Sequence, residues 1–251
     1  MYRLDQNKAA EAFRKYTEAY DPADPKIKLK INHTYRVAGI CAKIAASINE
    51  ERNLAWLCGL LHDIGRFEQV KRYHTFVDAE SIDHAELSHA LLFSEGLLEA
   101  FAPDLSSADK GILEKAVAYH SLYRLPADLT EKELTYCQIL RDADKIDIFR
   151  VNCDTPLEEI YNVSTEALKT AAVSDAVRQC FMNRTAVRRD LRKTAIDFLV
   201  GHICLAFELV YPISRQIAKE QGFAEKLLSF QSENLETAAW FAYMRKHIWD
   251  E

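Results

Sequence analysis

Apolar side chains recur at intervals of three and four residues along nearly the whole chain, and this spacing constrains the fold more than any other feature. Such a period places them on one face of an α-helix, whereas the alternating runs that predict strands are hard to find. Only 7 Gly and 6 Pro occur in 251 residues, and 49% of the residues are hydrophobic, so the composition also favours helices around a substantial core. The sequence therefore predicts an all-α protein.

Proline, glycine and capping residues divide this pattern into separate helices. "DPADPK" (21–26) is expected to end the first helix, because proline blocks helical hydrogen bonding. Further helices are predicted over about 29–49, 51–63, 82–100, 108–120 and 130–152, with three or four more beyond Pro156. Gly65 is expected to supply a left-handed cap after Asp63, and 66–81 to form a loop. Thr130 and Glu133 have the spacing of a capping box.

Charge and cysteine content narrow the class of protein. The net charge of −6 gives no general attraction to nucleic acid or to an anionic membrane, and neither is expected as a partner. The longest apolar run, "FLVGHICLAF" (198–207), is far shorter than the roughly 20 residues that span a bilayer. The N-terminal segment lacks the apolar core of a signal peptide, and the six cysteines form no CxxC pair. These features predict a cytoplasmic protein.

The stretch "LLHDIGRF" (60–67) ends a strongly apolar helix in a histidine and an aspartate, His62 and Asp63. A buried carboxylate is costly without a partner, and the C-terminal end of a helix repels negative charge. Asp63 therefore requires a cation, a hydrogen-bonding partner or a metal.

Other histidines and carboxylates share the inward faces of their predicted helices. His33 is in register with Val37 and Ile40, His120 follows Leu113 and Val117, and the Asp144 position falls with Cys137 and Leu140. A single inward histidine is usually a satisfied core residue. Several on separate helices favour a metal cluster, in which each polar group becomes a ligand; the alternative is a set of His–Asp pairs that stabilise the core.

The pattern of His33, the His62–Asp63 doublet and Asp144 within "RDADKID" resembles the HD-domain superfamily of metal-dependent phosphohydrolases. The resemblance implies an HD-domain helical bundle with additional C-terminal helices: one HD-type domain over 1–251, with a motif core of about 29–150 and a helical extension of about 156–251. It also implies that His33, His62, Asp63 and Asp144 hold one metal. Asp142 is the rival for the last role, but it points away from the stripe that Cys137 shares.

Members of this superfamily with two metals have two further histidines, for which this chain offers His84 and His120. His89 lies about 140° around the helix from His84, so only one of the two can face the site, and His84 is preferred. His74, His202 and His247 match no motif position. The subfamily that degrades cyclic dinucleotides carries "GYP" after its second added histidine, whereas this chain has "YRLP" (123–126), which leaves the substrate open.

The resemblance predicts hydrolysis of a nucleotide or another small phosphate ester by a water that two divalent ions (Mn, Fe, Co, Ni or Mg) activate. Asp63 would bridge the ions, and Arg66 and Lys145 would neutralise charge on phosphoryl oxygens. Glu68 or Asp147 is a candidate general acid. The same ligands occur in HD-type di-iron oxygenases, and a non-catalytic nucleotide-sensing module is a third reading. The oligomeric state stays open.

Overall fold

The computed structural model describes residues 4–250, and helices with their connecting segments account for all of that range, without a strand. The expected all-α fold is therefore confirmed. The chain divides into two compact units, Met1–Asp144 and Lys145–Glu251, with the boundary inside one long helix, α8 (Glu131–Asp154). The single HD-type domain over 1–251 stays a prediction.

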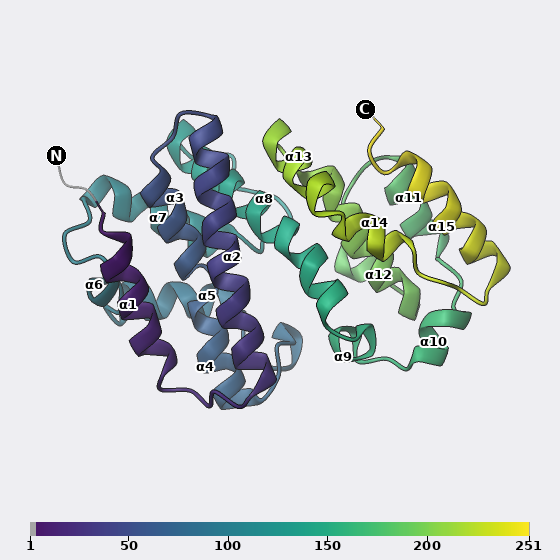
Figure 1. Cartoon of the computed structure of the whole chain (residues 1–251), viewed down its shortest axis with the longest axis horizontal. Helices are drawn as coiled ribbons and strands as arrows, with labels where there is room; N and C mark the ends of the chain where they lie inside the picture. Colours follow the sequence, from purple (N-terminus) through teal and green to yellow (C-terminus); the bar gives the residue numbers. More distant parts are fainter. Residues whose placement is uncertain (1–3, 251) are drawn as a thin grey trace. The chain divides into compact units, whose positions relative to one another are not determined.

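The N-terminal unit contains the six predicted metal ligands, and Figure 1 labels its helices. Its helices are α1 (Gln6–Thr17), α2 (Pro25–Ser47), α3 (Arg52–Leu61), α4 (Ile64–Tyr73), α5 (His84–His89), α6 (Leu98–Phe101), α7 (Ser107–Tyr119) and the first part of α8, with a 3-10 turn η1 (Asp78–Glu80) and a π-helical turn η2 (Ala90–Ser94). Helix α2 packs closely on α3, because a Cβ at Gly59 would lie 2.6 Å from the Cα of Ala38. This close approach brings the end of α3 beside the middle of α2.

The expectation for Gly65 and the following loop is wrong. Gly65 lies inside α4, which covers 64–73 of the segment expected to be a loop, and α4 ends instead at His74 with a φ of 58°. Helix α4 has a buried face of Ile64, Phe67 and Val70, which its many charged residues make hard to recognise in the sequence. Gly65 serves packing, since a Cβ there would lie 2.6 Å from the backbone nitrogen of Ser88 on α5. The glycine thus lets α4 and α5 approach each other.

One further expected helix is interrupted, and one expected boundary is confirmed. The helix expected over 82–100 is broken into α5, the π turn and α6, with Gly96 at a φ of 78° between the last two. The capping box of α8 is present: the Thr130 backbone N–H donates to Glu133 Oε2 at 2.8 Å, and the Glu133 N–H to Thr130 Oγ1 at 3.3 Å.

The C-terminal unit contains the end of α8 and more helices than the three or four expected beyond Pro156. They are α9 (Leu157–Tyr161), α10 (Thr165–Thr170), α11 (Asp175–Met182), α12 (Ala195–Ile203), α13 (Pro212–Gln221), α14 (Phe223–Leu228) and α15 (Leu235–His247), with 3-10 turns η3 (Arg189–Leu191) and η4 (Cys204–Glu208). Most are too short for a clear helical period to show in the sequence. Within residues 4–250, none of the helices is both long and apolar enough to cross a membrane.

Candidate metal centre

The His62–Asp63 doublet lies at the junction of α3 and α4, where both residues are buried. His62 Nδ1 lies 2.8 Å from the carbonyl oxygen of Gly59, a distance at which the ring donates its Nδ1–H. The other nitrogen, Nε2, then carries a lone pair, and it has no hydrogen-bond partner although it is buried. The helix end thus presents an imidazole lone pair to the interior.

His33 of α2 and Asp144 of α8 meet His62 at this point. Asp144 Oδ1 lies 3.2 Å from His33 Nε2 and 3.7 Å from His62 Nε2. One ligand atom from each of the three residues falls within 4.8 Å of the others. Burial opposes the ionisation of Asp144, but the His33 and His62 rings hold its pKa below the usual range. The structure therefore brings together three of the residues predicted to share one metal.

His84 of α5 and His120, at the end of α7, form a second pair of rings. Their Nε2 atoms lie 3.0 Å apart, and each is 3.7 Å from Asp63 Oδ1. His120 Nδ1 lies 2.7 Å from the carbonyl oxygen of Val117, so its Nε2 also carries the lone pair. Burial, followed by the nearby Arg66 charge, lowers the pKa of His84 to about 4, which keeps this ring neutral near pH 7.

Asp63 lies between the two groups of histidines. Its Oδ2 is 3.5 Å from His62 Nε2 and 3.7 Å from His33 Nε2, whereas its Oδ1 faces His84 and His120. Oδ1 is buried and has no hydrogen-bond partner. One carboxylate oxygen therefore faces each group, which is the arrangement that a bridging ligand requires.

Lys30 is a residue at this site that the sequence did not suggest. Its Nζ donates to Asp63 Oδ2 at 2.6 Å, and its side chain is only 14% exposed. Burial alone would raise the pKa of Asp63, but Lys30 and the His62 ring together hold it well below its ordinary value. Lys30 precedes His33 by three residues, so the two share a face of α2; that spacing is the signal that would have found it.

The donor set fits divalent metal ions. Imidazole nitrogens and carboxylate oxygens are ligands of first-row transition metals, and here such atoms of His33, His62 and Asp144 lie within 4.8 Å of one another, with both histidines buried. Two nitrogens bound at about 2.0–2.1 Å in adjacent positions of one ion lie about 3 Å apart, and His84 and His120 have that separation. The alternative of His–Asp pairs that only stabilise the core leaves His62 Nε2 and Asp63 Oδ1 without partners.

The other residues singled out in the sequence lie in different surroundings. Arg66 NH1 donates to Asp78 Oδ1 at 2.8 Å, while Arg66 Nε is 3.7 Å from Asp63 Oδ1. Lys145 and Asp147 are buried on α8, and so is Asp142. Glu68 accepts hydrogen bonds from Tyr20 and Arg72, so both carboxylate oxygens of this candidate general acid are already paired.

The two remaining histidines of the N-terminal unit, His74 and His89, lie outside the cluster. His89 Nε2 lies 2.9 Å from Glu114 Oε1, and His84 alone of the two α5 histidines joins the cluster. His74 is an exposed residue at the end of α4. The preference for His84 over His89 thus agrees with the geometry.

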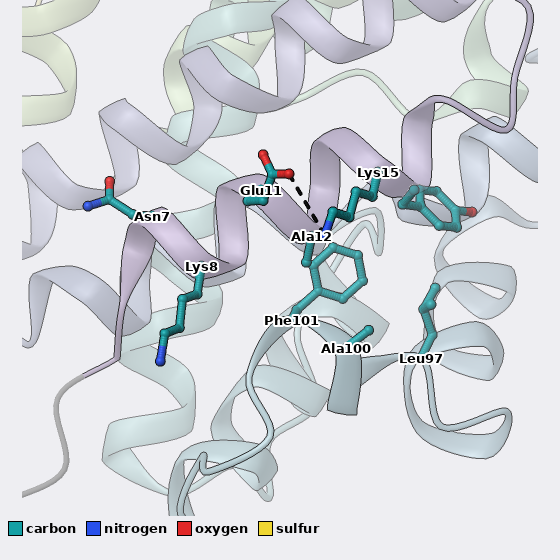
Figure 2. A pocket seen from close by; sticks show the side chains of 9 residues that line it. Asn7, Lys8, Glu11, Ala12, Lys15, Leu97, Ala100 and Phe101 are labelled. Carbon is teal, nitrogen blue, oxygen red and sulfur yellow. Dashed lines mark ion pairs between the residues drawn. The ribbon is translucent and has the colours of Figure 1, made fainter.

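A shallow groove of this unit is separate from the cluster. Figure 2 shows it between α1 and α6, with Lys8, Glu11 and Lys15 at its rim and Leu97 and Phe101 beside them. Lys15 Nζ lies 3.9 Å from Glu11 Oε1, one turn away on the same helix α1. None of the predicted ligands is among its lining residues.

Comparison with known proteins identifies the type of domain that holds these residues. Residues 31–148 match the family model described as HD domain, a range that holds His33, the doublet, His84, His120 and Asp144. The chain therefore carries an HD domain, and the resemblance read from these residues is confirmed.

One solved structure that resembles the chain is a predicted HD superfamily hydrolase from an uncultured Thermotogales bacterium. It shares 19% sequence identity, the match covers 92% of both chains, and the TM-score is 0.45. No curated protein matches the chain.

Proposed function

We propose that this protein is a metal-dependent phosphohydrolase that acts on a nucleotide or another small phosphate ester through a metal-activated water. The observation that carries the proposal is the convergence of imidazole Nε2 atoms around Asp63, with His62 Nε2 and Asp63 Oδ1 buried and without hydrogen bonds. Such a site is costly as a purely structural feature and favourable as a ligand set.

Two groups of residues would hold two ions. His33, His62 and Asp144 form one group, His84 and His120 the other, and Asp63 presents one oxygen to each. Divalent ions bound there supply a water of lowered pKa and a Lewis acid for phosphoryl oxygens. The protein contributes the neutral tautomers that the Gly59 and Val117 carbonyls fix, and it buries the histidine ligands and Asp63 away from bulk water.

Three side chains are proposed to act on the substrate or on the water. Asp63 orients the attacking water through its carboxylate, and Arg66 and Lys145 offset negative charge on the phosphoryl oxygens. Arg66 Nε is buried, has no hydrogen-bond partner and lies 3.7 Å from Asp63 Oδ1, so it is available to offset that charge. Lys145 directly follows the proposed ligand Asp144 on α8.

Metal analysis and a substrate screen test the proposal together. The protein is purified without chelator, its metals are quantified, and nucleotides and small phosphate esters are assayed with Mn, Fe, Co, Ni and Mg added back. Phosphate release that depends on metal and disappears in Asp63→Ala supports the hydrolase. Iron as the sole bound metal, with oxygen uptake and no phosphate release, would instead support the di-iron oxygenase. Nucleotide binding without turnover would support a sensing module.

The setting of the reaction is also part of the proposal. All six cysteines are free thiols, which agrees with the reducing cytoplasm that we propose as the location. A small phosphorylated substrate is proposed as the partner in place of nucleic acid or a membrane, in line with the net charge of −6.

A further inference from the structure

The segment 74–83, between α4 and α5, borders the proposed metal site. It carries Phe76, whose ring has the Lys30 ammonium at 5.4 Å and the Arg66 guanidinium at 5.6 Å from its centroid. It also carries Asp78 in the 3-10 turn η1, with a side chain that is only 10% exposed. A carboxylate this enclosed beside the site requires an explanation.

One oxygen of Asp78 is hydrogen bonded to a proposed metal ligand. Asp78 Oδ2 lies 2.8 Å from His84 Nδ1, so the carboxylate accepts the Nδ1–H of the neutral ring. His62 and His120 direct the corresponding proton to backbone carbonyls of their own helices, at residues 59 and 117. His84 begins α5 and has no preceding turn of its helix to supply such a carbonyl. Its ring therefore depends on a side chain from another segment.

The other oxygen of Asp78 is held by α4. Arg66 NH1 donates to Asp78 Oδ1 at 2.8 Å and to the Phe76 carbonyl at 2.7 Å. Gln69 Nε2 lies 3.0 Å from the same Oδ1, and 2.9 Å from both Ser81 Oγ and the Ile82 carbonyl. Gln69 is fully buried, and its Oε1 in turn accepts from Arg66. These two residues fix the segment 74–83 onto α4.

We propose that Asp78 is a positioning residue that orients His84 as a metal ligand, and that Arg66 and Gln69 act through Asp78 to set the affinity of the second metal. This inference rests on the proposed two-metal site and adds the residues that would set the affinity for one of the two ions. It gives Arg66 a positioning role, which its hydrogen bond to Asp78 supports, in addition to the charge-offsetting role proposed above. It also explains why Arg66 and Gln69 lie three residues apart on one face of α4.

Metal titration of the full-length protein tests the inference. Asp78→Ala is expected to weaken binding of one of two Mn²⁺ equivalents by about 10–100-fold and to leave the other unchanged, because outer carboxylates contribute that much to the affinity of a histidine site. Asp78→Asn keeps one acceptor oxygen but cannot serve both His84 and the Arg66–Gln69 pair, so partial recovery is expected. Lys71→Met, which removes an exposed charge from α4, the helix that holds Arg66 and Gln69, is the control and is expected to bind both equivalents normally.

A second measurement does not require metal or activity. In the metal-free protein, the ¹⁵N shifts of His84 report which ring nitrogen carries the proton, and Asp78→Ala is expected to reduce the Nδ1–H form while His120 keeps it. If Asp78→Ala folds, binds both Mn²⁺ equivalents with unchanged affinity and leaves the His84 tautomer as it was, the inference is overturned.

His84→Ala separates this failure from failure of the proposed function. If His84→Ala loses one equivalent and Asp78→Ala does not, only the positioning role is wrong. If His84→Ala binds as many equivalents as the natural chain, the two-metal site itself is wrong and the inference fails with it. Arg66→Met in the Asp78→Ala background is expected to weaken the second metal no further, because Arg66 acts through Asp78.

Discussion

The two compact units each bury an aspartate, and the two aspartates differ in what surrounds them. Asp197 in the C-terminal unit is fully buried and accepts backbone N–H groups from Ser174, Lys193 and Thr194 at 2.9, 2.9 and 3.0 Å. Asp63 in the N-terminal unit is equally enclosed, yet its Oδ1 has no hydrogen bond and faces imidazole nitrogens. The backbone thus accounts for the buried charge at Asp197 and does not at Asp63.

The histidines show the same contrast. His202 Nδ1 lies 2.9 Å from both the Tyr161 hydroxyl and Asn152 Oδ1, inside a local network of the C-terminal unit. His62 uses Nδ1 for a backbone carbonyl and leaves Nε2 without a partner. Burial alone therefore does not distinguish these two histidines, whereas the Nε2 of His62, buried and without a hydrogen bond among other imidazoles and carboxylates, does.

The largest expected effect is at the doublet. His62→Ala or Asp63→Ala is expected to abolish binding of metal and metal-dependent phosphatase activity, because each removes a ligand that the rest of the site cannot replace. The natural chain should gain about 2.7 kcal/mol of stability at a metal concentration 100 times the Kd, and the variants should gain none. Elemental analysis and thermal melts with and without chelator measure this. A variant that retains both metal and activity would contradict the metallohydrolase proposal.

The next effect separates two metals from one. His84→Ala and His120→Ala are each expected to lose about one equivalent of metal, whereas His89→Ala, whose ring pairs with Glu114, loses none. An anomalous diffraction map of crystals grown with Mn²⁺ provides the direct check, with two peaks about 3.5–4 Å apart expected. One peak, with His84 and His120 away from it, would leave a mononuclear site.

The next prediction concerns Asp197, the buried aspartate of the C-terminal unit that was compared with Asp63 above. Asp197→Ala is expected to lower the free energy of unfolding by about 2 kcal/mol, because it leaves three partly buried backbone N–H groups and the start of α12 without their acceptor. The number of bound metal equivalents should not change. Chemical denaturation in the presence of chelator gives the stability, and loss of metal by the folded variant would break the distinction between the two aspartates.

Much of the site was predictable because its ligands lie on faces that apolar residues mark. His33, His120 and Asp144 share stripes with buried side chains of α2, α7 and α8, and the HD pattern then relates these stripes to each other. The boundaries that capping residues define, such as that at Thr130, were predictable for the same reason: the signal is local.

The rest depends on contacts between segments that no local pattern encodes. Asp78 lies in a connection without periodicity, and only the folded chain brings it to His84. Gly65 was wrongly predicted to cap a helix. A glycine is required there for the close approach to Ser88, and the sequence alone does not distinguish this role from a helix cap. The shortest C-terminal helices, α9, α10, α11 and α14, escaped prediction because five to eight residues hold too little of a 3.6-residue period.

The smallest expected effect tests the satisfied network of the C-terminal unit. The Tyr161 hydroxyl donates to Asn152 Oδ1 at 2.6 Å and lies 2.9 Å from His202 Nδ1, and burial raises the pKa of Tyr161 above its ordinary value. Tyr161→Phe removes this hydroxyl, but His202 and Asn152 remain 2.9 Å apart and can still pair. The loss should therefore be only about 1 kcal/mol of unfolding free energy, with metal content unchanged. Urea denaturation measures the difference, and a loss several times larger would contradict the expectation that Asn152 compensates for the lost hydroxyl, and with it the contrast between the units.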